Sequence, residues 1–166
     1  LTLPAELVEP QLSLSTVFTK DLDCTSSPDA VITGTITGGY APFTHEVSIN
    51  GGAFATLGTT GSPFVYTTAN SGTYQFRVTD AQGCTVESGI TTIDPLSPPA
   101  ISAVVQAQDI LCFGDDNGSI TVTIDTSVGT PPFVINVHND TTGTNYGAQT
   151  SGLAAGAYTV TVTDAK

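Results

Sequence analysis

The sequence predicts an all-β protein built of tandem antiparallel β-sandwich repeats, and three observations support this prediction. Thr, Gly, Ser, Val and Ala are among the commonest of the 166 residues, and runs of strong helix formers are missing. Apolar and polar side chains alternate with a period of two in several short segments. Turn residues such as Gly, Pro, Asn and Ser separate these segments at close spacing, which favours a sandwich over a fold that contains helices.

Four segments show the alternation most clearly. Residues 31–37 and 120–124 alternate early in each half of the chain, and residues 74–78 and 158–162 alternate late in each half. A period of two is typical of strands that bury one face against a core. We therefore expect these four segments to be half-buried strands.

Turn chemistry supplies two further predictions. Asn50-Gly51-Gly52 predicts a tight hairpin, because glycine accepts positive φ angles at little cost. A Gly-x-Tyr pattern opens the late strand in each half, at 72–74 and at 156–158. This pattern predicts a tyrosine corner, in which the phenol oxygen bonds to backbone while the ring packs.

The second half of the chain matches the first in three ordered blocks, which indicates an internal repeat. The matching blocks are Cys24 with Cys112, residues 38–43 with 128–133, and residues 71–81 with 155–165. The offset changes between the blocks, so the length difference lies in the loops between them.

These matches predict the domain organisation. Residues 1–10 resemble residues 90–95, since each stretch ends on an acidic residue followed by Pro, and we expect them to be the last strand of a preceding repeat. Residues 11–96 form a first, divergent sandwich repeat. Residues 97–166 form a second repeat that stops before its last strand, and Ser97-Pro98-Pro99 at its start is a stiff connector.

The charge balance disfavours nucleic acids and anionic lipids as partners. Three Lys and Arg residues stand against fifteen Asp and Glu residues, for a formal net charge of −12. This charge repels nucleic-acid phosphates and anionic lipid headgroups, so we expect no nucleic acid as a partner. No apolar run reaches the roughly 18 residues of a membrane-spanning helix, so we expect no membrane insertion.

The cysteines predict an oxidising compartment. Cys24 precedes the first strand pair and Cys84 follows the turn at 80–83, so we expect both at one end of a sandwich and joined by a disulfide. Closing a loop of roughly 60 residues would stabilise the domain by about 4 kcal/mol. Cys112 has no such partner, and we expect it to pair with a cysteine just beyond residue 166.

A family resemblance rests on the second repeat. Residues 112–120, which read Cys-Phe-Gly-Asp-Asp-Asn-Gly-Ser-Ile, and residues 152–164 resemble the SprB-type repeat of gliding-motility cell-surface adhesins of Bacteroidetes. The first repeat departs from the pattern, because residues 25–29 replace the Gly-Asp-Asp-Asn-Gly stretch. The chain also resembles immunoglobulin-like and PKD domains at the level of the fold.

The resemblance implies a function and a location. It implies a structural segment of a very large filamentous adhesin, outside the cell and on the outer-membrane exterior, that takes part in gliding motility and surface attachment. The implied partners are neighbouring repeats of the same chain, the type IX secretion and gliding machinery, and extracellular surfaces or polysaccharides. No nucleophile motif and no glycine-rich phosphate loop stands in the sequence, so we expect no enzyme and no cofactor.

Three weaker candidate sites remain. Asp115, Asp116 and Asn117 offer oxygen ligands for Ca²⁺, but the spacing lacks the EF-hand pattern and is also typical of a turn. Thr141 lies in an Asp-Thr-Thr stretch that resembles a short O-glycan acceptor motif of Bacteroidetes. His45 and His138 fall at different places in the repeat, so we expect no shared metal site.

The alternative to an adhesin segment is a carbohydrate-binding or spacer module of a secreted enzyme. Carbohydrate binding would need an exposed aromatic platform. Most aromatic residues occupy core positions of the alternating pattern, and Tyr40, Phe113 and Tyr146 are the candidates for exposure.

Overall fold

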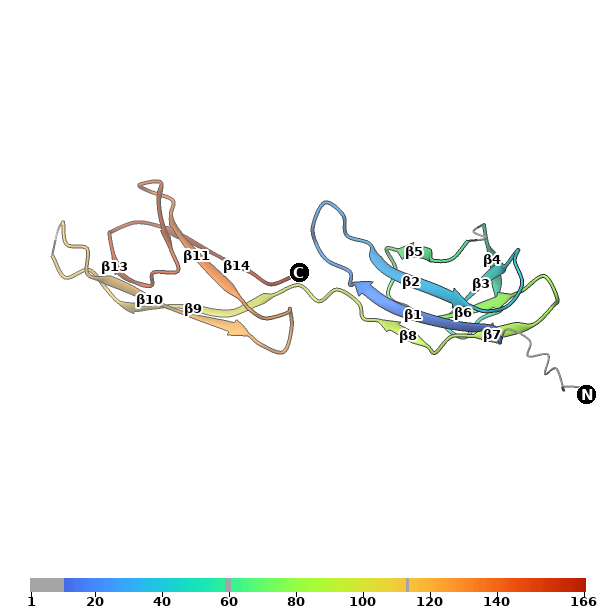
Figure 1. The fold of residues 1–166 in the computed structure, drawn as a ribbon. Helices are drawn as coiled ribbons and strands as arrows, with labels where there is room; N and C mark the ends of the chain where they lie inside the picture. Colours follow the sequence, from blue (N-terminus) through green and yellow to red (C-terminus); the bar gives the residue numbers. More distant parts are fainter. Residues whose placement is uncertain (1–10, 59–60, 113) are drawn as a thin grey trace, which may run out of the picture. The chain divides into compact units, whose positions relative to one another are not determined.

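The computed structural model describes residues 11–58, 61–112 and 114–166, and the chain forms two compact units, Leu1–Leu96 (unit 1) and Ser97–Lys166 (unit 2) (Figure 1). All regular elements of the described residues are strands, and all of their pairings are antiparallel. The all-β prediction is therefore confirmed. Residues 1–10, predicted to be a strand of a preceding repeat, lie outside the described residues.

Unit 1 contains two sheets. One has the strand order β1-β2-β5, and the other has the order β4-β3-β6-β7, with β8 also paired to β6. The strands are β1 (Ser13–Lys20), β2 (Ala30–Thr37), β3 (Thr44–Ile49), β4 (Ala55–Leu57), β5 (Phe64–Thr68), β6 (Gly72–Thr79), β7 (Thr85–Glu87) and β8 (Thr91–Ile93).

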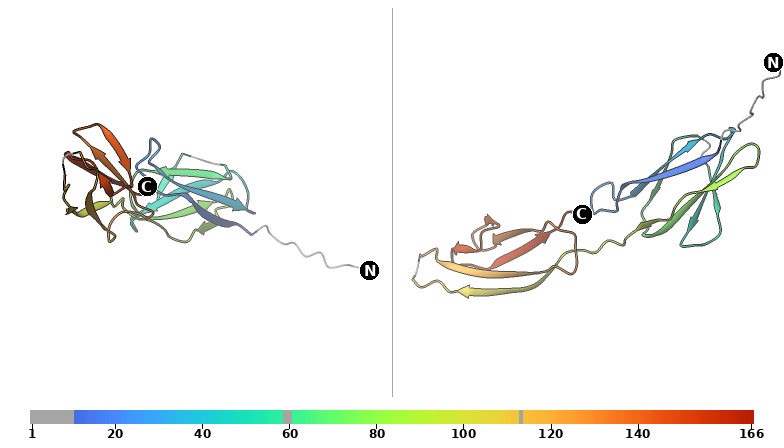
Figure 2. Two further views of the ribbon diagram at one scale, coloured as in Figure 1. Left: turned by 90° about the vertical axis from the view of Figure 1, so that its left-hand side faces the viewer. Right: turned by 60° about the horizontal axis from the view of Figure 1, so that its bottom comes forward.

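The two sheets of unit 1 bury one core between them, as in a β-sandwich (Figure 2). The alternation at 74–78 places Tyr74, Phe76 and Val78 of β6 in this core, with exposures of 1%, 0% and 0%. Phe64 of the opposite sheet packs on Phe76, with ring centroids 5.6 Å apart. The predicted half-buried strands at 31–37 and 74–78 are confirmed by this burial.

The hairpin predicted at 50–52 joins β3 to β4. Asn50 and Gly51 have φ angles of 52° and 70°, and the Gly52 N–H donates to the carbonyl of Ile49 at 3.0 Å. The positive φ angles of two consecutive residues explain why Asn and Gly stand here.

Unit 2 contains two smaller sheets, with the orders β13-β10-β9 and β12-β11-β14. Its strands are β9 (Ala100–Gln108), β10 (Gly118–Asp125), β11 (Val134–Asn139), β12 (Thr144–Gly147), β13 (Ser151–Leu153) and β14 (Tyr158–Thr163). The alternating segments predicted at 120–124 and 158–162 lie in β10 and β14, where apolar residues are half-buried and the threonines between them are exposed.

Both units contain the same hydrogen bond between a tyrosine and the turn before its strand. The Tyr74 hydroxyl donates to the carbonyl of Asn70 at 2.8 Å, and the Tyr158 hydroxyl donates to the carbonyl of Ala154 at 2.6 Å. In each unit the acceptor lies four residues before the tyrosine. The tyrosine-corner prediction, a phenol oxygen bonded to backbone, is confirmed at both positions.

In both units an aspartate directly follows the strand that contains the tyrosine, β6 or β14, and accepts a hydrogen bond from the loop before β3 or β11. The Asp80 carboxylate accepts from the Tyr40 N–H at 3.1 Å, and the Asp164 carboxylate accepts from the Thr130 N–H at 2.8 Å. The next residue along the chain, Ala81 or Ala165, donates its N–H back to the carbonyl of Tyr40 or Thr130. The pairing of β3 with β6 and that of β11 with β14 also align equivalent residues.

Candidate functional site

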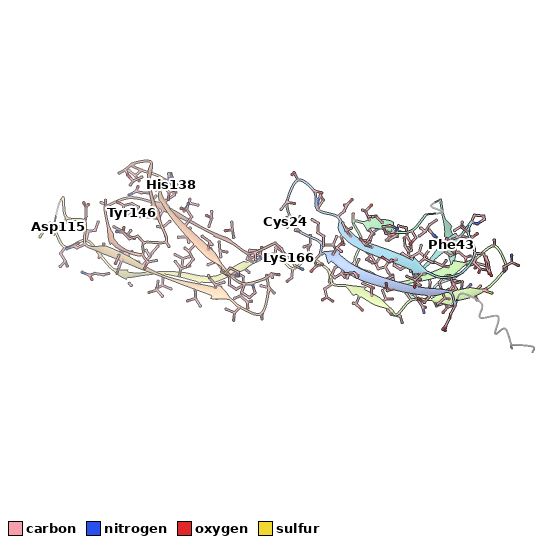
Figure 3. The ribbon with its side chains drawn as sticks, viewed as in Figure 1. Cys24, Phe43, Asp115, His138, Tyr146 and Lys166 are labelled. Carbon is pink, nitrogen blue, oxygen red and sulfur yellow. The ribbon has the colours of Figure 1, made fainter. Side chains whose placement is uncertain are left out.

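Cys24 and Cys84 are free, exposed thiols at opposite ends of unit 1. Cys24 lies in the loop after β1. Cys84 follows β6 and lines a cavity with Gln11 and Leu12, which immediately precede β1. Figure 3 shows Cys24 at one end of the unit and Phe43, which precedes β3, at the other.

The length of β1 therefore separates the two thiols. Eight residues of a strand span about 26 Å, whereas the Cα atoms of a disulfide lie less than about 7 Å apart. The structure contradicts the predicted bridge between Cys24 and Cys84. The prediction was wrong because it placed both cysteines at the same end of the sandwich. Five strands, β2 to β6, lie between them, and a chain that crosses an antiparallel sandwich an odd number of times ends at the opposite end.

Cys112 is also free and exposed, in the loop between β9 and β10. Asp115, in the same loop, and Lys166 are labelled at opposite ends of unit 2 in Figure 3. A cysteine directly after Lys166 would start from the end of unit 2 that lies away from Cys112.

The loop around Cys24 is organised by Lys20. Its ammonium group donates to the carbonyls of Ser27 at 2.7 Å and Asp29 at 3.0 Å, and it lies 2.9 Å from the Asp23 carboxylate. A hydrogen bond from the Thr25 hydroxyl, together with Lys20, lowers the pKa of Asp23 to about 2. These bonds form inside one loop, so they stabilise its shape and do not create a binding pocket.

The predicted calcium ligands are used within their own loop. The Asn117 amide donates to the Asp115 carboxylate at 3.3 Å, and its oxygen accepts from the Leu111 N–H at 3.4 Å. Asp115 and Asp116 are exposed. Within the described residues, no group of three His, Cys, Asp or Glu side chains is placed to hold a metal ion.

The candidate glycan acceptor Thr141 is exposed at the end of β11. Its hydroxyl oxygen accepts from the Ala157 N–H at 3.0 Å, and its own N–H donates to the Asn139 side chain at 2.9 Å. The hydroxyl thus takes part in the connection between β11 and β14.

The two histidines have different environments. His45 is fully buried in β3, with its ring 4.6 Å from that of Phe64, and this burial lowers its pKa. His138 lies on β11, and its Nε2 atom is 4.0 Å from the Asp140 carboxylate.

Of the aromatic residues predicted to be exposed, Tyr40 is exposed and Tyr146 packs against another ring. Tyr40 is 48% exposed. The Tyr146 ring is half-buried and packs 6.0 Å from that of Tyr158, and its hydroxyl accepts from the Ala154 N–H at 3.3 Å. Phe113 lies outside the described residues.

One face of the β1-β2-β5 sheet is a surface that the sequence analysis missed. Val17 of β1, Thr33 of β2 and Val65 of β5 stand in one row across the three strands, and the two valines are 58% and 57% exposed. The Ser13 and Thr37 hydroxyls are 2.6 Å apart. We call this the neutral face; it is formed by Ser13, Ser15, Val17, Thr19, Val31, Thr33, Thr35, Thr37, Val65 and Thr67.

The residues of the neutral face are uncharged, although the chain has a net charge of −12, and Lys20, which pairs with Val31 across a β-bulge, borders the face. Its signal in the sequence is the alternation at 31–37, where Thr occupies the positions opposite the core. The sequence alone did not reveal that two further strands extend this row.

Each unit contains a cavity of about 330 Å³ or more. In unit 1, a cavity of about 860 Å³ is lined by Tyr40, Asp80, Gln82 and Cys84 together with Gln11, Leu12 and Thr85. In unit 2, a cavity of about 330 Å³ lies between β10, β13 and the start of β14. The second one is lined by the apolar residues Ile110, Ile120 and Leu153 and by the polar residues Gln106, Gln108 and Asp109.

Asp80 in the unit 1 cavity is already saturated with hydrogen bonds. Burial by itself raises the pKa of this carboxyl, but the backbone donors outweigh burial and lower the pKa below its ordinary value. The donors are the N–H groups of Cys84, Tyr40, Gln82 and Gly83. Asp80 therefore acts as a structural carboxylate that joins the turn after β6 to Tyr40.

None of the described residues forms a helix that is long and apolar enough to cross a membrane. In comparisons with known proteins, no family model and no curated protein matches the chain.

Proposed function

We propose that this chain is a structural and adhesive segment of a large filamentous cell-surface protein, in which immunoglobulin-like units follow one another in tandem. Each unit adds length, and the exposed sheet faces add contacts to extracellular surfaces or polysaccharides. The segment is not an enzyme and uses no cofactor. It acts outside the cell, where gliding motility and attachment take place and where export by the type IX system delivers it.

The observation that carries the proposal is the set of hydrogen bonds common to both units. The tyrosine bonds of Tyr74 and Tyr158 and the aspartate bonds of Asp80 and Asp164 occur at equivalent strand positions. Such agreement supports two copies of one module. Between them lies a Pro-rich connector, Asp94 to Pro99, which favours a semi-rigid joint.

Strand order supports the immunoglobulin-like assignment. In unit 1 the orders β1-β2-β5 and β4-β3-β6-β7 correspond to the A-B-E and C′-C-F-G strands of such a sandwich. The tyrosine at the start of β6 occupies the position of the tyrosine corner, near the start of strand F.

The neutral face supports the adhesive part of the proposal. An acidic protein repels other anionic surfaces at long range, and this repulsion is weakest over an uncharged patch. Hydroxyl groups and valine side chains suit weak contacts with neutral polysaccharides. Many units in one filament would sum such contacts through multivalency.

A bead assay tests the adhesive role. Beads coated with the chain are expected to attach to polysaccharide-coated glass, and the double variant Val17→Asp with Val65→Asp is expected to lower attachment several-fold. Ile90→Asp is the matched control, because Ile90 is 68% exposed and lies outside the neutral face. Equal attachment of both variants would contradict the role of this face.

Deletion in the native protein tests the structural role. Removing residues 11–166 from the cell-surface protein is expected to shorten its filament in electron micrographs and to weaken attachment of the cells. A protein of ordinary size with a catalytic domain, or cells that attach and spread normally, would count against the proposal.

The alternative function, a carbohydrate-binding module, is favoured by one observation. Tyr40 is exposed and lines the unit 1 cavity together with the side chains of Gln11 and Gln82. An aromatic ring beside amide groups suits the binding of a sugar ring. Binding to a glycan array that is lost in Tyr40→Ala and kept in Tyr146→Phe would establish this second function.

A further inference from the structure

The neutral face of unit 1 has the same order of side chains when it is read from either edge of its sheet. Strand β2 is the central strand of this sheet, between β1 and β5. In two neighbouring rows across the strands, the residue on β1 is of the same type as the residue on β5, and β2 carries the other type. The rows are Val17–Thr33–Val65 and Thr19–Val31–Thr67.

These rows project from the side of the sheet that faces away from the core. On β2 and β5 they alternate with Ile32 and Phe64, which lie in the core with exposures of 0% and 3%. Val17 and Val65, by contrast, are 58% and 57% exposed. Because neighbouring strands are about 4.8 Å apart, the two valines stand about 10 Å apart on the open surface.

Unit 2 repeats only part of this arrangement in the residues that the structure describes. Val105 of β9 pairs with Thr121 of β10, as Val17 pairs with Thr33, and Val105 is 57% exposed. The third strand of that sheet, β13, pairs with the first two residues of β10 and does not reach Thr121. The row therefore ends after two strands and lacks the second valine.

We propose that the neutral face of unit 1 packs against the same face of a second copy of the chain. When the second copy is turned by half a revolution about an axis parallel to the strands, its β5 lies over β1 and its β1 lies over β5. Val17 of each copy then contacts Val65 of the other, as an isologous interface requires. The inference rests on the proposed function in one respect, since it assigns a partner to the face proposed there as adhesive.

Sheet geometry limits the strength of this contact. Two twisted sheets that pack face to face lie about 10 Å apart and cross at about −30°, so they approach most closely around the central rows. Three strands about 4.8 Å apart, with eight residues at about 3.3 Å each, cover roughly 400 Å². A standard stable interface buries about 800 Å² on each partner. One pair of faces is therefore expected to associate weakly, and several such faces in one filament would sum their contacts.

The distribution of charge permits close approach at this face. Each copy carries a net charge of −12, but the residues of the neutral face are uncharged, so two acidic chains meet here with little repulsion. Lys20 at the border of the face lies 2.9 Å from the Asp23 carboxylate, which offsets its charge. The loop with Asp21, Asp23 and Asp29 follows β1 and lies at the same end of both copies. Salt is expected to strengthen the pairing, because it screens the repulsion between these loops.

An NMR dilution series of the full chain tests the proposal. The amide signals of Val17, Thr33 and Val65 are expected to shift as the concentration rises. Val17→Asp is expected to weaken the association at least about tenfold, because it places a carboxylate among apolar side chains. Val105→Asp, at the corresponding and similarly exposed position of unit 2, is the matched control and is expected to associate like the unchanged chain. Unaltered signals of the core residues show that the variants are folded.

An exchange of charges tests which residues meet. Val65→Lys alone is expected to weaken the association as Val17→Asp does. The double variant Val17→Asp with Val65→Lys is expected to regain part of it, since each introduced carboxylate then faces an introduced ammonium group of the other copy. Val17→Asp with Val65→Asp is the control and is expected to regain none, because like charges then face each other.

Three outcomes would overturn the inference. Signals of the neutral face that do not shift at any concentration rule out a second copy as the partner. Association that Val17→Asp leaves unchanged, or that Val105→Asp weakens equally, belongs to another surface. A failure of Val17→Asp with Val65→Lys to regain any association rules out the proposed axis.

A soluble neutral polysaccharide, dextran, separates this inference from the adhesive role. If dextran shifts the signals of the neutral face in a dilute sample and a rise in concentration does not, the face is reserved for polysaccharides, and the pairing is refuted while the proposed function stands. If the chain pairs in solution but beads coated with it do not attach to polysaccharide, the adhesive role is refuted and the pairing stands.

Discussion

The Tyr74 hydroxyl donates to the carbonyl oxygen of Asn70 at 2.8 Å and so ties the start of β6 to the turn before it. The same hydroxyl lies 3.1 Å from the Thr68 hydroxyl at the end of β5. Because β5 and β6 belong to opposite sheets, one side chain links both layers of the unit 1 sandwich. The ring itself is 1% exposed.

Removing this hydroxyl is expected to destabilise unit 1. Tyr74→Phe keeps the ring but removes the hydrogen bonds to the buried Thr68 hydroxyl and to the Asn70 carbonyl, at a cost of about 1 to 3 kcal/mol. Urea unfolding followed by NMR signals of unit 1 measures the change. Tyr40→Phe is the control, since Tyr40 is 48% exposed, and a loss of the same size there would refute the explanation.

Asp80 is expected to make the free energy of unfolding of unit 1 depend on pH, with a loss of stability in acid. Its pKa is lowered in the folded state, because backbone N–H donors outweigh the opposing effect of burial. Because the pKa is lower in the folded chain, the ionised Asp80 stabilises unit 1 fully at pH values above the ordinary pKa of 3.8. This stabilisation is lost as the pH falls through the pKa of the folded state. Asp80→Asn should therefore lower the melting temperature at neutral pH, and the difference should shrink in acid. Asp94→Asn, an exposed connector residue, should lower it little at any pH.

His45 is expected to weaken unit 1 as the pH falls below 6.5. Burial lowers its pKa in the folded state, so the unfolded chain takes up the proton first. Stability is unaffected above the ordinary pKa of 6.5 and declines from there until the folded value is reached. His45→Leu should remove this decline in urea midpoints measured between neutral and mildly acidic pH. His138→Leu should keep it, because His138 lies in unit 2.

Gly34 is expected to tolerate no side chain. A Cβ atom at this position of β2 would overlap the ring of Phe64 on β5. Gly34→Ala should destabilise unit 1 by about 1 to 3 kcal/mol through overpacking. Gly58→Ala is the matched control, because nothing lies within 4 Å of a Cβ atom there. Equal midpoints in urea for the two variants would show that the ring moves aside.

All three cysteines are expected to react as free thiols in the folded chain. A thiol reagent should label Cys24, Cys84 and Cys112 without denaturant, since all three are exposed. A reducing agent should leave the melting temperature unchanged, whereas loss of a disulfide across roughly 60 residues would remove about 4 kcal/mol. A Cys24–Cys84 peptide in non-reducing mass spectrometry would contradict the structure.

The sequence by itself determined the local structure. The alternation at 74–78 fixed which side chains of β6 face the core, because a strand turns successive residues to opposite faces. Asn50 and Gly51 determined a hairpin through their φ preferences, and Gly-x-Tyr determined a hydrogen bond to a carbonyl only four residues away. Each of these features depends on neighbours in the chain, so the pattern of residues was sufficient.

Only the tertiary structure decided which distant residues meet. The sequence predicted that Cys24 and Cys84 lie at the same end of unit 1. In the structure the length of β1 separates them. The neutral face appeared only when β1 and β5 were paired on either side of β2. The physical reason is that sheet topology sets which strand ends and faces coincide, and many topologies satisfy the same alternation of apolar and polar residues.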